Sequence, residues 1–111
     1  MEFAMAKDLN RAEYFDMYRP LLTEKQCGIM EMYYFSDLSL GEISEETGIT
    51  RQAAFNCIKK CEERLTELEN ALGLLKKREE AKKDFEKLKG FIKENKAAEA
   101  LELLEELQKK L

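Results

Sequence analysis

One stretch of the chain decides its fold: LSLGEISEETGITRQAAFNCIKKCEERL, residues 38–65. Ser39 and Glu42 have the spacing of a capping box, which predicts that a short helix begins just after Ser39. Gly48 stands where a residue with positive φ ends a helix at low cost. Thr50 is a favoured N-cap and predicts the start of a second helix. Two helices around such a turn predict a helix-turn-helix.

The apolar residues of this stretch fit that motif. Ser44 is the small residue at the point where the two helices would cross. The predicted inward positions on the two helices and the turn are Leu40, Ile43, Ile49, Ala54 and Ile58. A short apolar helix pair without any binding role uses the same pattern, so both interpretations stay open at this level.

The second helix continues as a long heptad seam. Its apolar positions are spaced alternately four and three residues apart: Ala54, Ile58, Cys61, Leu65, Leu68, Leu72 and Leu75. Gly73 weakens such a helix locally but need not end it. The seam is either buried by the N-terminal helices or shared with a second copy, and homodimerisation through the C-terminal helices is therefore expected.

Helical signals also flank the motif. Residues 8–18 have near-helical apolar spacing, and Pro20 closes that segment. Thr23 and Gln26 form a second capping box before a helix dense in large apolar groups.

Beyond the seam, two amphipathic segments predict a helical hairpin. Ala81, Phe85, Leu88 and Ile92 form the first apolar stripe, shifted in phase from the seam, so a kink or a short loop is expected near residues 76–80. Residues 94–96 break the pattern. The second stripe consists of Ala97, Leu101, Leu104, Leu107 and Leu111.

Composition supports an all-α fold. Of 111 residues, 38% are charged and one is proline, which is typical of helical proteins. We expect a winged-helix-like helix-turn-helix domain over residues 1–75. Residues 76–111 are expected to form a C-terminal helical extension that serves dimerisation.

Several functions are disfavoured. The chain has no histidine and no glycine-rich phosphate loop, so we expect no enzyme, no catalytic residue and no cofactor. Cys27, Cys57 and Cys61 are expected to be reduced core residues rather than metal ligands, so no metal is predicted. There is no membrane-length apolar run and no signal layout in the first fifteen residues, which predicts a cytoplasmic protein without membrane contact.

The start of the second motif helix carries candidate nucleic-acid contacts. In a helix-turn-helix this part of the recognition helix meets base edges, and Arg and Gln suit guanine and adenine edges. Thr50 would join a phosphate contact at the helix start. The candidate residues are Thr50, Arg51, Gln52, Phe55, Asn56, Lys59 and Lys60.

Charge argues against avid binding. Residues 37–65 contain four basic and six acidic residues, a local net of −2, and the sequence pI is about 5.1. Because phosphate neutralisation supplies most non-specific affinity, weak binding of DNA or RNA is predicted. Residues 76–96 hold nine basic against five acidic residues, either a solvated face or an auxiliary phosphate contact. The auxiliary candidates are Lys76, Lys77, Arg78, Lys82 and Lys83.

Three segments carry a family resemblance: LLTEKQ at residues 21–26, MEMYYFSDLSLGEISEETGITRQA at 30–53, and IKKCEERL at 58–65. Over about residues 17–65 the chain resembles the YlxM family of small bacterial proteins, and its motif is similar to region 4 of bacterial sigma factors. The motif positions that match are Ser39, Glu42, Gly48, Arg51, Gln52 and Ala53. Ala54-Phe55-Asn56 departs from the larger aliphatic and tyrosine expected there.

The resemblance implies a helix-turn-helix DNA-binding protein. It also implies a regulatory role in the signal recognition particle pathway, because family members are typically encoded beside the GTPase subunit of that particle. The competing hypothesis is a protein–protein interaction module that contacts particle components through its helices, supported by the acidic first motif helix and the leucine-rich C-terminal stripe.

Overall fold

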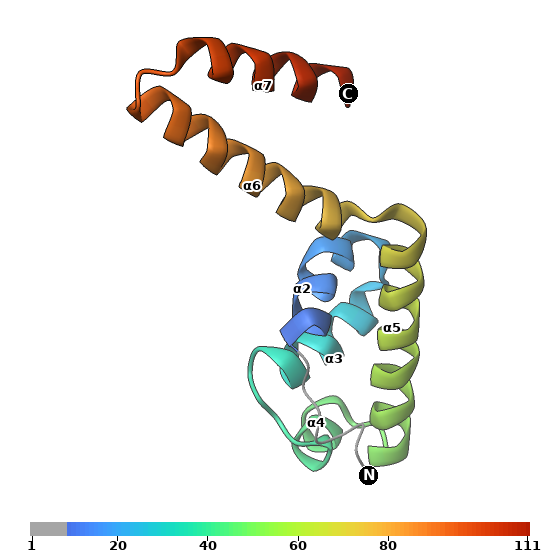
Figure 1. The fold of residues 1–111 in the computed structure, drawn as a ribbon. Coiled ribbons are helices and arrows are strands. Elements are labelled where there is room, and N and C mark those ends of the chain that lie inside the picture. Colours follow the sequence, from blue (N-terminus) through green and yellow to red (C-terminus); the bar gives the residue numbers. More distant parts are fainter. Residues whose placement is uncertain (1–8) are drawn as a thin grey trace. The chain divides into compact units, whose positions relative to one another are not determined.

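A computed structural model describes residues 9–111, which form helices joined by short turns (Figure 1). The α-helices are α2 (Leu9–Tyr18), α3 (Glu24–Tyr34), α4 (Leu40–Thr47), α5 (Arg51–Leu72), α6 (Leu74–Lys93) and α7 (Ala97–Lys109). A 3-10 turn, η1 (Arg19–Leu21), follows α2 and contains Pro20. The all-α prediction is confirmed, and the winged-helix-like expectation is wrong for residues 9–111, because a wing needs strands and these residues form only helices and turns. Residues 1–8 of the predicted first domain lie outside the described residues.

The chain divides into two compact units between Leu75 and Lys76. In the N-terminal unit, α5 packs against α2, α3 and α4 around one core. The core is formed by Phe15, Tyr18, Ile29, Met30, Tyr33, Ile43, Ala54, Ile58, Cys61, Leu65 and Leu68. The first five seam residues are therefore buried by helices of their own unit, and that part of the seam is not available to a second copy.

The predicted caps begin and end the motif helices as the sequence indicates. Thr23 and Gln26 form a complete capping box at α3, and Ser39 and Glu42 form one at α4. Gly48 has φ 80°, the left-handed conformation that ends α4. The helix boundaries at both ends of the turn are thus fixed by local side-chain and backbone chemistry.

Gly48→Ala is expected to lower the free energy of unfolding by about 1 kcal/mol, because alanine is strained at this positive φ. Gly28→Ala serves as the matched control: this glycine lies inside α3, and a Cβ there meets nothing within 4 Å. That substitution should stabilise the protein by about 0.5–1 kcal/mol. Urea unfolding monitored by circular dichroism measures both, and equal shifts would contradict the assigned turn.

Gly73, which the sequence marks as a weak point of the helix, ends α5. It has φ 61°, and α6 begins at Leu74. The Tyr18 hydroxyl donates to Glu69 Oε1 at 2.5 Å and accepts from the Leu74 amide at 3.1 Å. The Leu75 amide also donates to Glu69 Oε1, at 3.0 Å. These contacts satisfy the first amides of α6, so a new helix can begin here.

The kink or short loop expected near residues 76–80 does not interrupt those residues, because α6 is continuous from Leu74 to Lys93 and the break lies at Gly73. The break precedes the expected range by three residues, and the change of apolar phase between Leu75 and Ala81 falls inside α6. Leu72, a predicted seam residue next to this break, is 45% exposed.

The C-terminal unit is the predicted helical hairpin, in which α6 and α7 diverge from the turn at residues 94–96 (Figure 1). Asn95 makes that turn with φ 59°. Ala100 is buried and Leu103 and Leu107 are half-buried, so they form the inward row of α7. The predicted stripe lies beside this inward row, since Leu101, Leu104 and Leu111 are exposed. The apolar arc of α7 is wide enough for either row, and helical period alone does not select between them.

Candidate nucleic-acid interface

Hydrogen bonds within the turn hold the two motif helices together. The Ser44 hydroxyl donates to the Ile49 carbonyl at 2.5 Å, and the Thr47 hydroxyl donates to the Ile43 carbonyl at 2.7 Å. Ile43, Ala54 and Ile58 are fully buried where α4 meets α5. Ser44 therefore does more than provide a small contact, because its hydroxyl also closes the turn.

The start of α5 presents most of the predicted contact residues to solvent. The exposed ones are Thr50, Arg51, Gln52, Asn56, Lys59 and Lys60, whereas Phe55 is half-buried. Gln52, Asn56 and Lys59 follow the spacing i, i+4, i+7 and share the outward stripe of the helix. Gln52 Nε2 donates to Asn56 Oδ1 at 3.1 Å, which joins the two amides into one polar surface. Thr50 caps the helix, since its hydroxyl oxygen accepts from the Ala53 amide at 3.0 Å.

Arg51 has a neighbour that the sequence did not reveal. Its side chain lies against α4 at Gly41, where an added Cβ would be 3.0 Å from Arg51 Nη2. The missing side chain of Gly41 therefore leaves space for the guanidinium. Arg51 consequently leans toward α4, while Gln52 and Asn56 face outward.

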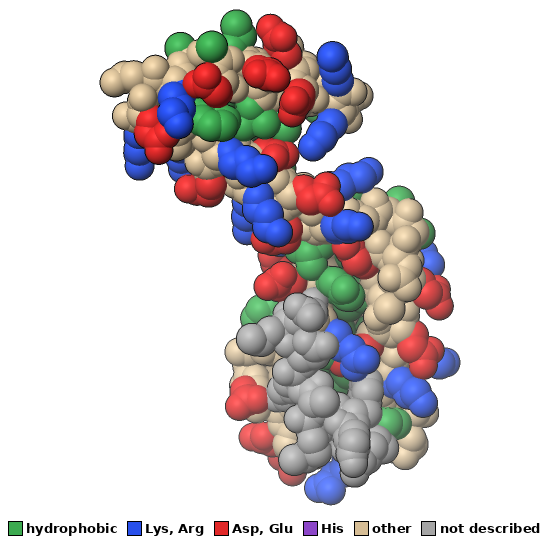
Figure 2. Space-filling view, viewed as in Figure 1, with side chains coloured by type: hydrophobic (Ala, Val, Ile, Leu, Met, Phe, Trp, Pro, Cys, Tyr) green, Lys and Arg blue, Asp and Glu red, His purple; other side chains and the backbone are tan. Residues whose placement is uncertain are grey.

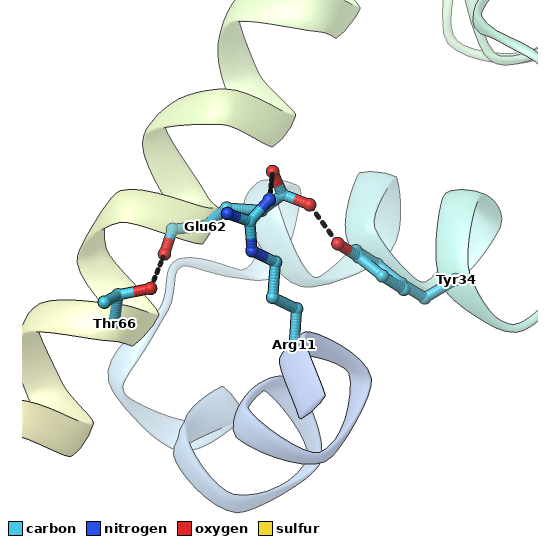
Figure 3. Close-up of polar contacts among 4 residues, drawn as sticks. All are labelled: Arg11, Tyr34, Glu62 and Thr66. Carbon is cyan, nitrogen blue, oxygen red and sulfur yellow. Dashed lines mark hydrogen bonds and ion pairs between the residues drawn. The ribbon is translucent and has the colours of Figure 1, made fainter. Parts of the chain in front are cut away.

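A buried carboxylate, Glu62, changes the charge count of this region (Figure 3). Its side chain is 2% exposed, and Arg11 Nη1 lies 3.0 Å from Glu62 Oε1. The Tyr34 hydroxyl donates to Glu62 Oε2, and the Thr66 hydroxyl donates to the Glu62 carbonyl at 2.9 Å. Burial, and then the hydrogen bond to Glu62, raise the pKa of Tyr34.

Glu62 therefore belongs to the core and presents no charge to a ligand. Sequence reasoning counted it among six acidic groups of the motif; five of those remain exposed, against four basic residues. The sequence does indicate that Glu62 faces inward, because Ile58, Glu62 and Leu65 continue the inward i, i+4, i+7 pattern of α5. The Glu42 carboxylate accepts a hydrogen bond from the Ser39 amide at the start of α4, and this hydrogen bond lowers the pKa of the carboxyl group.

The auxiliary basic residues Lys76, Lys77, Arg78, Lys82 and Lys83 are all exposed on α6. They belong to the C-terminal unit, whereas the start of α5 belongs to the N-terminal unit. Figure 2 shows basic side chains of the C-terminal unit interspersed with acidic ones. Lys82 Nζ lies 3.4 Å from Glu79 Oε1. This exposed i,i+3 ion pair contributes little to stability.

Other kinds of site find little support among the described residues. Burial raises the pKa of Cys61 to about 12, and Cys27 and Cys57 are half-buried thiols. No group of three potential ligand side chains within residues 9–111 is arranged to hold a metal ion. In that same range, every helix is too short or too polar to cross a bilayer.

The crossed helices α4 and α5, the glycine-centred turn and the exposed start of α5 define a helix-turn-helix protein. Residues 5–109 match the UPF0122 family model, described as "Putative helix-turn-helix protein, YlxM / p13 like". The chain belongs to this family, and the resemblance expected from its sequence is confirmed.

Similar bacterial proteins carry the same family name. A "UPF0122 protein" of Bacillus thuringiensis (strain Al Hakam) is 48% identical over 71 residues, which cover 63% of this chain and 64% of the relative. "UPF0122 protein BH2485" of Halalkalibacterium halodurans is 48% identical over 68 residues, covering 61% and 62% of the two chains. The chain thus spans just under two thirds of the length of these relatives.

Proposed function

We propose that this protein is a non-enzymatic, cytoplasmic helix-turn-helix regulator that binds DNA weakly through the start of α5. The observation that carries the proposal is the exposed polar stripe of Gln52, Asn56 and Lys59 on a helix seated by its partner helix. Amide side chains of this kind read adenine edges in the major groove, and the flanking cations contact phosphates.

The wider role that we propose is regulation of the signal recognition particle pathway. Its support is the family resemblance, because YlxM-type proteins are typically encoded beside the GTPase subunit of that particle. Weak binding fits the exposed charges of the motif, in which acidic groups on α4 offset the cations of α5.

Arg51→Ala/Gln52→Ala is expected to weaken binding to the cognate duplex by about tenfold or more, because base contacts contribute about 1–3 kcal/mol each. The duplex is first selected from a random pool, and binding is measured by fluorescence anisotropy. Arg64→Ala/Asn70→Ala is the matched control, since it removes one exposed guanidinium and one exposed amide from the distal part of α5. If both double variants bind alike, the start of α5 is not the reading surface.

We further propose that the auxiliary basic face contacts phosphate, so Lys83→Ala is expected to reduce the slope of log affinity against log salt by about 1. Lys83 is exposed on α6, and its loss removes one neutralised phosphate. Lys109→Ala on α7 removes the same charge from the same unit and should leave the slope unchanged. A slope that Lys83→Ala does not alter would exclude this residue from the interface, and RNA is tested in parallel.

The second candidate is a protein–protein interaction module, which the exposed leucines of α7 favour. Capture from bacterial lysate with and without nuclease separates the two functions. Retention of signal recognition particle components after nuclease would support the module, whereas their loss together with nucleic acid would support the DNA-binding proposal.

A further inference from the structure

We propose that the C-terminal unit is a dimerisation element, in which a second copy of the chain covers one face of the α6–α7 hairpin. Each α6 lies against the partner's α7. The proposal does not depend on nucleic-acid binding, because it concerns only surfaces of the C-terminal unit.

The hairpin leaves several large apolar side chains exposed. They are Phe85 (56%), Ile92 (62%), Leu101 (57%), Leu104 (44%) and Leu111. Each directly follows a residue on the side of its helix that faces the hairpin partner, as Leu104 follows half-buried Leu103 and Leu101 follows buried Ala100. The exposed residues thus form two rows, one along α6 and one along α7, each beside the internal contact of the hairpin.

The two rows lie on the same face. One residue step rotates an α-helix by about 100°, so each row is turned in the same sense from the inward direction. In two antiparallel helices, the same sense of rotation leads to the same face of the pair. Figure 2 shows apolar side chains gathered between the two helices of the C-terminal unit.

A groove of about 390 Å³ opens within the hairpin. Its apolar lining consists of Ala81 and Phe85 on α6, Leu107 on α7 and Leu111 just beyond the end of α7. The charged residues Lys77, Glu80, Asp84 and Lys110 line the rest. The ion pair between Lys110 Nζ and Asp84 Oδ2, at 3.7 Å, spans its rim. Since α6 and α7 do not fill this space themselves, apolar side chains from another molecule have room to enter it.

Charge identifies the occupant as a second copy. Helix α6 carries eight basic and four acidic residues, a net of +4, whereas α7 carries one basic and four acidic residues, a net of −3. Lys82 and Lys89 lie on the exposed apolar face of α6, one position after Ala81 and Leu88. Two copies of α6 would repel each other, but α6 against the partner's α7 pairs opposite charges.

This pairing is compatible with twofold symmetry. A twofold axis parallel to the helices places the face of one copy on the same face of its partner, as an isologous interface requires. Every helix is then antiparallel to its neighbours, as in an up-down four-helix bundle. Lys89 of one copy lies near the level of Glu105 on the partner's α7.

Sedimentation equilibrium of the full chain tests whether the exposed apolar face of the hairpin mediates dimerisation. The wild type is expected to have twice the 13.0 kDa chain mass. Leu101→Glu is expected to raise the dimer dissociation constant by at least about tenfold, because it buries a carboxylate in the interface. Leu21→Glu is the control, since Leu21 in the N-terminal unit is likewise 57% exposed, and circular dichroism verifies that both variants remain helical. A monomeric wild type, an unchanged dimer dissociation constant in Leu101→Glu or equal loss in both variants overturns the proposal.

A charge swap tests which helices pair. Lys89→Glu and Glu105→Lys should each weaken the dimer severalfold, and the double variant should restore it, because the two charges exchange places across the interface. If α6 packed on the partner's α6, the second substitution would not rescue the first. Absence of rescue therefore overturns the proposed arrangement.

Discussion

Glu62→Ala is expected to lower the free energy of unfolding by about 3 kcal/mol, the low end of the range for removing one partner of a buried ion pair. The substitution deprives the Tyr34 hydroxyl of its acceptor and Arg11 of its counter-ion. The low end applies because the Arg11 side chain is 37% exposed and is able to turn toward water. Urea unfolding at neutral pH, monitored by circular dichroism, gives the value.

The neighbouring Glu63 provides the control for this substitution. Glu63 is exposed on the same helix, so Glu63→Ala should change the free energy of unfolding by less than about 0.5 kcal/mol. The two substitutions make the same change in formal charge. Similar effects would mean that Glu62 affects stability only through net charge. The contacts of Glu62 with Arg11 and Tyr34 would then not stabilise the fold.

Ile43→Ala is expected to cost about 3 kcal/mol, within the range for truncating a buried isoleucine. Ile43 is fully buried and is the buried residue of α4, a helix of eight residues. A helix this short has little stability of its own, so it depends on this contact with α5. Hydrogen exchange at the α4 amides should accelerate more than exchange in α2 and α3.

Leu21→Ala is the control for the packing of α4, since it truncates a large aliphatic side chain that is 57% exposed in the same unit. Its effect should stay below about 0.5 kcal/mol. If Ile43→Ala were equally mild, α4 would not be anchored through its buried face.

The features that could be predicted from the sequence are those fixed by neighbouring residues. Thr23, Ser39 and Thr50 each satisfy amides within three residues, and Gly48 adopts its φ because of its own missing side chain. Such chemistry acts within one turn of helix, so spacing alone reveals it. The helix-turn-helix and its boundaries follow from these positions.

Other features depend on contacts between distant residues. The break at Gly73 is stabilised by Tyr18, whose hydroxyl accepts a hydrogen bond from the Leu74 amide. These two residues are 56 positions apart in the sequence. Glu62 is buried because Arg11 lies 51 positions away in sequence yet reaches it in space. Glycine occurs both inside helices and at their ends, so Gly73 alone does not reveal the break. The inward spacing of Glu62 indicates where it lies, but not the partner that neutralises it.

The junction that begins α6 has a practical consequence for dividing the chain. Tyr18 and Glu69 lie in α2 and α5, and both bind amides of Leu74 and Leu75. A fragment that stops at Gly73 would leave a buried phenol and a carboxylate facing an empty helix end. An autonomous N-terminal fragment should therefore extend past Leu75, and the first turn of α6 should be treated as part of it.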